Sequence, residues 1–172
     1  MNNTLFNAQG EQVPARPDWD SHKEAIVEMA MDTLFAEKYC DFEGSDRDSL
    51  KSVLLDSYYS NIDEYDLAKK FESDGWDVDR DFIAALENIC EHLSMAERQV
   101  VLGWFDDNKP VAPFNICDEL IVDGEVGVIS EIFKHSPAYF GVKMPGMDEN
   151  TCRLIKFEDA VPHLKVLPIN KE

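Results

Sequence analysis

Residues 106–115 read DDNKPVAPFN, and they divide the chain into two parts with different hydrophobic periods. Pro110 and Pro113 have no backbone N–H to donate to a helix or a central strand, so the stretch predicts a break. We place a linker at residues 108–115. Before it, apolar residues recur every three to four positions, as in helices; after it they alternate, as in strands. The sequence therefore predicts an α+β fold.

The part before the linker, residues 18–107, is expected to be an acidic bundle of about five helices. Three are expected over about 18–39, 46–60 and 63–73, with a fourth from Asp79 and a fifth from Ser94. The first carries Trp19, Ile26 and Met29 at helical spacing, which predicts that they share its buried face. Ser94-Met95-Ala96-Glu97 has the S-x-x-E pattern of a capping box, which predicts the start of the fifth helix. Residues 1–17 form a separate N-terminal segment that can make a short hairpin around Gln9-Gly10.

Residues 116–172 are expected to form a small β domain. Strand-like stretches lie at 120–122, 126–129, 139–143 and 153–156, and Asp123-Gly124 and Pro145-Gly146 mark turns. The runs EVGVISEI, YFGV and RLIKFEDA, which begin at residues 125, 139 and 153, together resemble the strand order of small SH3-like barrels of the KOW type. The resemblance implies a barrel and no particular activity, because such barrels host many functions. Nucleic-acid-binding members rely on basic surfaces, which this segment does not have.

Charge is the most unusual property of the sequence. There are 35 Asp and Glu residues against 16 Lys and Arg, a net charge of -19. Residues 18–107 hold 24 acidic and 8 basic residues, a net of -16, and the remainder holds 11 and 8, a net of -3. This argues against nucleic acid or an anionic membrane as a direct ligand, because phosphates are bound by Lys and Arg, and it favours a basic protein as partner. The alternative is that the charge serves only solubility or a salt-adapted host.

One group of acids has a regular spacing. Asp20, Glu24, Glu28 and Asp32, here called the acidic row, recur every four residues along the first helix, roughly 6 Å apart. That distance is of the order of the spacing of phosphates along a nucleic-acid strand. Three like-charge pairs destabilise the helix by roughly 1 kcal/mol, so the row is a candidate partner-binding surface; the alternative is a solvated outer face. The predicted surface extends to further acids: Asp63, Glu64, Asp66, Asp74 and Asp77.

The sequence contains no catalytic, cofactor or metal-binding motif that we can identify. Asp77-x-Asp79-x-Asp81 has the alternation of an EF-hand loop, but Phe82 and Asn88 stand where Gly and Glu are required. The cysteines at 40, 90, 117 and 152 form no C-x-x-C pair, which predicts free thiols without zinc. We see no signal-peptide pattern and no apolar run long enough to span a membrane, and therefore expect a cytoplasmic protein.

These observations predict a non-enzymatic inhibitor that imitates nucleic acid and occupies the basic groove of a nuclease, a restriction enzyme or a CRISPR complex. In composition and size alone, the chain resembles acidic anti-CRISPR and anti-restriction proteins of phages and mobile elements. One alternative is an immunity protein that neutralises a basic toxin through aromatic anchors such as Tyr58, Tyr59 or Trp76. Another is an adaptor whose SH3-like part holds a peptide. An enzyme with a non-local site is the weakest alternative, and the sequence does not give the oligomeric state.

Overall fold

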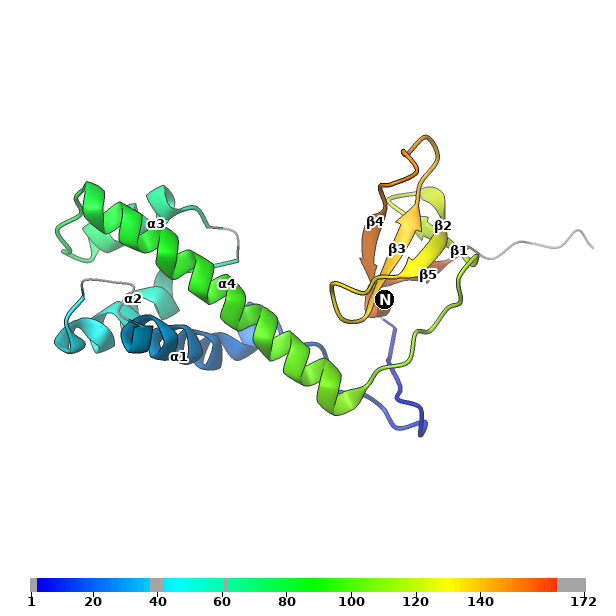
Figure 1. Cartoon of the computed structure of the whole chain (residues 1–172), viewed down its shortest axis with the longest axis horizontal. Helices are drawn as coiled ribbons and strands as arrows, with labels where there is room; N and C mark the ends of the chain where they lie inside the picture. Colours follow the sequence, from blue (N-terminus) through cyan, green and yellow to red (C-terminus); the bar gives the residue numbers. More distant parts are fainter. Residues whose placement is uncertain (1–2, 38–41, 61, 164–172) are drawn as a thin grey trace, which may run out of the picture. The chain divides into compact units, whose positions relative to one another are not determined.

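The structure is a computed structural model that describes residues 3–37, 42–60 and 62–163. Helices occupy the N-terminal two thirds of the described chain, and an antiparallel sheet follows them (Figure 1). The chain divides into two compact units: residues 16–104, here called the helical unit, and residues 1–15 with 105–172, here called the sheet unit. The α+β fold predicted from the change in hydrophobic period is confirmed.

In the described residues there are four α-helices, not five. They are α1 (Trp19–Glu37), α2 (Arg47–Ser57, preceded by a 3-10 turn at Gly44–Asp46), α3 (Glu64–Ser73) and α4 (Arg80–Asn108). The predicted start at Ser94 is wrong, because Ser94 lies inside α4 and is exposed there. Leu93 and Ala96 are buried on both sides of it, so the apolar face runs on through the capping-box pattern. Burial along the whole helix outweighs the local preference of Ser for a helix start.

Aspartates begin three of these helices. The backbone N–H groups of Ser21, Asp66 and Phe82 donate to the carboxylates of Asp18, Asp63 and Asp79, at 2.9, 2.8 and 2.8 Å. Each bond satisfies a donor that has no partner within the first turn, and each carboxylate lies at the positive end of the helix dipole. Part of the acidic composition therefore has a structural use.

The core of the helical unit is built from all four helices and contains a cluster of aromatic rings. Phe71 is fully buried, and its ring centroid lies 5.4 Å from those of both Trp76 and Phe82. Gly75, with φ +91°, ends α3 and lets the Trp76 N–H return to the Phe71 carbonyl at 3.1 Å. This left-handed glycine turn brings Trp76 back over the end of the helix. Together with its partly buried neighbours, this core positions the surfaces described below.

The sheet has the strand order β4-β3-β2-β1-β5 and curls into a half-barrel (Figure 1). Its strands are β1 (Glu119–Val122), β2 (Glu125–Ile132), β3 (Tyr139–Lys143), β4 (Arg153–Lys156) and β5 (Val161–Pro162). Asp123 and Gly124, with φ of 50° and 85°, make the two-residue turn between β1 and β2 that the Asp-Gly pair predicts. The four predicted strand stretches all lie within β1 to β4. β5 has only two residues, too few to show a period.

The N-terminal segment belongs to the sheet unit. The Asn3 backbone N–H and side-chain amide each donate, at 2.6 Å, to carbonyls of Glu158 and Ala160. A bridge between Phe6 and Gln12 closes a narrow loop further along the segment. No helix of the described chain combines the length and apolar content needed to cross a bilayer.

Candidate functional site

The acidic row lies on α1, but the structure divides it into two halves. Arg47 of α2 places Nη2 2.5 Å from Glu28 Oε1 and 2.8 Å from Asp32 Oδ1. Lys51, one turn further along α2, pairs with the other carboxylate oxygen of Glu28. The carboxylates of Asp20 and Glu24 make no hydrogen bond or ion pair with any other described residue, and both side chains are exposed. The uncompensated charge of the row is therefore concentrated in its first half.

The ion pairs keep the second half of the row ionised. Hydrogen bonds from Lys51 and then from Arg47 lower the pKa of Glu28 below its ordinary value, and the Glu28 carboxylate in turn raises the pKa of Arg47. Both effects favour the charged forms at neutral pH. The paired groups neutralise one another, so a partner approaching Glu28 and Asp32 meets little net charge.

The second predicted group of acids, at the two ends of α3, is likewise divided by structural tasks. Asp63 caps the helix, and Asp66 forms an ion pair with Lys69 Nζ at 2.7 Å. Asp74 and Asp77, which flank the Gly75-Trp76 turn, are exposed, and their carboxylates have no hydrogen bond or ion pair in the described chain. Glu64 is half-buried. Asp20, Glu24, Asp74 and Asp77 are therefore the predicted site residues with exposed, uncompensated charge, here called the free acids.

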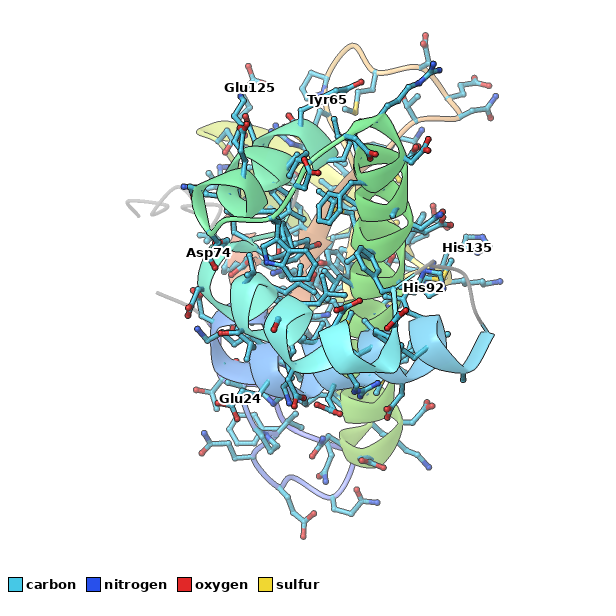
Figure 2. The ribbon with its side chains drawn as sticks, turned by 90° about the vertical axis from the view of Figure 1, so that its left-hand side faces the viewer. Glu24, Tyr65, Asp74, His92, Glu125 and His135 are labelled. Carbon is cyan, nitrogen blue, oxygen red and sulfur yellow. The ribbon has the colours of Figure 1, made fainter. Side chains whose placement is uncertain are left out.

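Basic side chains are outnumbered in the helical unit, and several of them contact other groups. The helical unit holds 22 acidic and 9 basic residues, a net of -13, whereas the sheet unit holds 13 and 7, a net of -6. Besides the ion-paired Arg47, Lys51 and Lys69, two more cations contact groups of their own unit. Lys23 Nζ donates to the Leu55 carbonyl at 3.2 Å, and Arg16 lies over the Trp104 ring at 4.9 Å. Figure 2 shows Glu24 and Asp74 at the surface of the helical unit.

The candidate aromatic anchors have unequal exposure. Tyr58 is buried, with its ring centroid 4.6 Å from that of Trp19, and burial raises its pKa. It belongs to the core and cannot anchor a partner, which corrects that part of the immunity-protein hypothesis. Trp76 is half-buried in the aromatic cluster, whereas Tyr59 is 53% exposed. Tyr65 of α3 is 60% exposed and becomes a further candidate.

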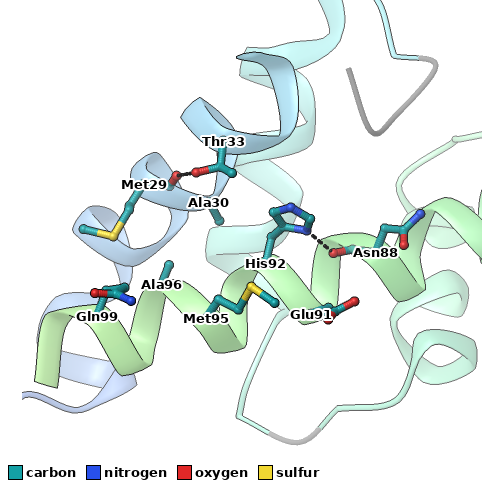
Figure 3. A pocket seen from close by; sticks show the side chains of 9 residues that line it. All are labelled: Met29, Ala30, Thr33, Asn88, Glu91, His92, Met95, Ala96 and Gln99. Carbon is teal, nitrogen blue, oxygen red and sulfur yellow. Dashed lines mark hydrogen bonds between the residues drawn. The ribbon is translucent and has the colours of Figure 1, made fainter. Parts of the chain in front are cut away.

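A groove lies between α1 and α4 (Figure 3). Its volume is about 470 Å³, and its walls are formed by Met29, Ala30 and Thr33 of α1 and by Asn88, Glu91, His92, Met95, Ala96 and Gln99 of α4. Met29 is 40% exposed, so its assignment to the buried face of the first helix is wrong. Met29 lies at the edge of that face, where the period alone does not separate core from rim. The sequence did not indicate Met95 as a groove residue, because it lies within the capping-box pattern that predicts a helix start.

Within the described residues, no three His, Cys, Asp or Glu side chains come close enough together to hold a metal ion. Asp79, in the middle of the EF-hand-like alternation, caps α4. Burial, assisted by the nearby charges of Glu64 and Asp63, raises the pKa of the Cys90 thiol to about 11, so it is a poor nucleophile at neutral pH. Cys117 and Cys152 are free thiols, and Cys40 lies outside the described residues.

The geometry thus brings together an acidic helical surface, exposed tyrosines and a methionine-lined groove, all within residues 16–104. Exposed charge and exposed apolar area in one unit are features that suit contact with another macromolecule. No protein family, no curated protein and no solved structure matches the chain.

Proposed function

We propose that the chain is a non-enzymatic, cytoplasmic binding protein whose helical unit docks on the basic surface of a nucleic-acid-handling protein and competes there with nucleic acid. The partner is a nuclease, or a restriction or CRISPR complex. The observation that carries the proposal is the charge of the helical unit, which is -13 while at least five of its nine basic residues contact its own groups. A surface of this kind accelerates association with a basic partner and excludes nucleic acid sterically.

The surface that we propose for docking is narrower than the nine acids of the sequence prediction. The free acids are its centre, because neutralising them does not break a helix cap or an ion pair of the described chain. Asp20 and Glu24 are one helical turn apart. This single pair has the spacing that is expected of a phosphate mimic. Tyr59 and Tyr65 are exposed and lie close in sequence to the predicted acids at the start of α3. Their rings supply apolar contact there.

A second candidate function, peptide binding by the sheet unit, is favoured by one observation. Ile121 of β1 is 40% exposed and pairs across the sheet with Val126 (37%) on one side and Val161 (45%) on the other. These side chains form an apolar strip on the outward face of the sheet. A return of the last strand to the first, as in the order β4-β3-β2-β1-β5, is compatible with an SH3-like barrel of the KOW type, which we propose as the finer description of this unit.

The decisive experiment compares two variants with equal loss of charge. In the first, the free acids are neutralised as Asp20→Asn, Glu24→Gln, Asp74→Asn and Asp77→Asn. In the control, four exposed acids of the sheet unit are changed as Glu125→Gln, Asp148→Asn, Glu149→Gln and Asp159→Asn. The partner is captured from the native host by affinity purification and identified by mass spectrometry. Its association rate with the wild type and both variants is then measured at two salt concentrations.

We expect the first variant to associate about tenfold more slowly at low salt, with less effect at high salt, and the control to resemble the wild type. Duplex nucleic acid should compete with the wild type for the partner. Competition would be missing if the protein were an immunity protein that binds its toxin away from the nucleic-acid site. Loss of binding in the control alone would make the sheet unit the working surface and contradict the proposal.

A further inference from the structure

The α1–α4 groove is lined by small buried side chains and by one exposed methionine from each helix. Ala30 and Ala96, which are 1% and 4% exposed, are the small side chains. Met29 stands on one wall and Met95, 52% exposed, on the other (Figure 3). Thioether side chains are flexible and polarisable, so such walls adapt to apolar side chains of different shapes.

Two polar residues of the groove have hydrogen-bond partners within their own helices. Thr33 Oγ1 donates to the Met29 carbonyl at 3.1 Å, and His92 Nδ1 lies 2.8 Å from the Asn88 carbonyl. These groups do not require a polar ligand. An occupant that places apolar atoms in the groove therefore leaves these two hydrogen bonds unbroken.

The lining of the groove contains one acidic residue, Glu91, and no Lys or Arg. Glu87 is exposed and stands one turn before Glu91, so the same side of α4 presents Glu87, Glu91 and Met95 at successive i, i+4 positions. A second copy of this chain is a poor occupant, because its helical unit also carries -13. The complementary occupant is apolar on one side and cationic on the other.

We infer that the groove between α1 and α4 binds a cationic amphipathic helix of the basic partner, with apolar side chains of that helix between Met29 and Met95 and its Lys or Arg side chains toward Glu87 and Glu91. This inference rests on the proposed function and adds the element that the partner supplies. A volume of about 470 Å³ accepts a small number of anchor side chains, as when the apolar face of a helix lies in a groove.

The test uses the full chain and three synthetic peptides of about 18 residues, long enough to form a helix on binding. The first is a Lys/Leu peptide with an amphipathic pattern, the second has the same composition in scrambled order, and the third replaces Lys by Glu. Binding is followed through the ¹³C-methyl NMR signals of the methionines. Met29 and Met95 report on the groove, exposed Met147 of the sheet unit is the matched control, and buried Met31 reports on the fold.

We expect the Lys/Leu peptide to shift the signals of Met29 and Met95 and to leave Met147 unchanged. Met29→Gln with Met95→Gln should weaken its binding about tenfold, whereas Met147→Gln should not. The scrambled peptide should bind at least tenfold more weakly, and the Glu/Leu peptide should not bind. An unchanged Met31 signal shows that the double variant is folded.

Equal binding of the ordered and scrambled cationic peptides, without Met29 and Met95 shifts, would overturn the groove while leaving the electrostatic docking proposal standing. Binding of the Glu/Leu peptide would overturn the assignment of a cationic occupant. If the free-acid variant binds the natural partner as fast as the wild type but the Lys/Leu peptide still shifts Met29 and Met95, the docking proposal fails and the groove inference holds.

Discussion

In both the helical unit and the sheet unit, basic side chains contact groups of their own unit. The two units nevertheless differ in surface charge. In the helical unit, Arg47 and Lys51 pair with carboxylates of α1. In the sheet unit, Arg153 pairs with Asp123 at 2.6 Å, and Lys143 Nζ donates to three carbonyls of the loop after β3, two of them at 2.5 and 3.0 Å. The formal net charges of the two units, with paired residues included, are -13 and -6. The acidic surface is therefore chiefly a property of the helical unit, whereas exposed apolar side chains occur in both.

The largest expected losses of stability come from removing one buried ring from the core of each unit. Phe71→Ala in the helical unit and Phe140→Ala in the sheet unit each remove a fully buried ring and should lower the free energy of unfolding by about 3–5 kcal/mol. Urea unfolding should be followed by tryptophan fluorescence for the helical unit, which contains Trp19, Trp76 and Trp104, and by backbone-amide NMR signals for the sheet. Losses below 1 kcal/mol would show that these rings are not packed as described.

The same two variants test whether the units unfold independently. If the units unfold separately, each variant should lower the stability of its own unit more than that of the other. Equal losses in both units from either variant would show that they unfold as one cooperative body.

The difference between the units also explains what the sequence could predict. The hydrophobic period of the sequence located the helical region and the four longer strands, because burial of one face is a local pattern. It failed where a local motif competed with a continuous core, as at Ser94, and where a residue lies at the edge of an apolar face, as Met29 does. In the sheet, Asp123-Gly124 specifies its own turn, so that prediction depended on no distant residue.

The candidate site was less predictable than the fold, because its charges are decided across helices. The positions of the acidic row on α1 follow from the sequence. Its division into free and paired halves depends on Arg47, which lies 19 residues beyond Glu28 in the chain and becomes its neighbour only when α1 packs on α2. The α1–α4 groove depends in the same way on the packing of two helices, and no local spacing marks it.

Thiol reactivity should separate the two units next. With its pKa raised to about 11, Cys90 of the helical unit should have a thiolate fraction at pH 8 on the order of 100-fold below that of an ordinary thiol. Cys117 of the sheet unit is exposed. Timed alkylation followed by peptide mass spectrometry should find Cys90 at least tenfold slower than Cys117. Comparable rates would contradict the burial of Cys90; Glu64→Gln should speed its reaction slightly, because it removes a nearby negative charge.

Two glycine-to-alanine substitutions, one in each unit, should change the free energy of unfolding in opposite directions. Gly124→Ala forces a side chain into φ +85° and should destabilise the β1–β2 turn by about 1 kcal/mol. Gly103→Ala lies in α4, where an added methyl meets no atom within 4 Å, and should stabilise the helix by about 0.5–1 kcal/mol. Chemical unfolding of both variants measures the difference. The same sign for both would show that one of the two local conformations is wrong.

The smallest effect concerns the pairing that divides the acidic row. Because the pKa of Glu28 is lowered in the folded state, its carboxylate favours folding at pH values above the ordinary glutamate pKa, and this contribution is lost as the pH falls through the lowered value. Arg47→Gln removes one of the two hydrogen bonds that lower it and frees Asp32, so the pKa of Glu28 should rise toward the ordinary value and added salt should matter less. A carboxyl-detected NMR titration measures this directly. Lys69→Gln, which breaks a separate pair with Asp66 on α3, is the control and should leave the Glu28 titration unchanged. If Arg47→Gln leaves it unchanged as well, Arg47 does not neutralise the second half of the row, and all four carboxylates return as candidates for the docking surface.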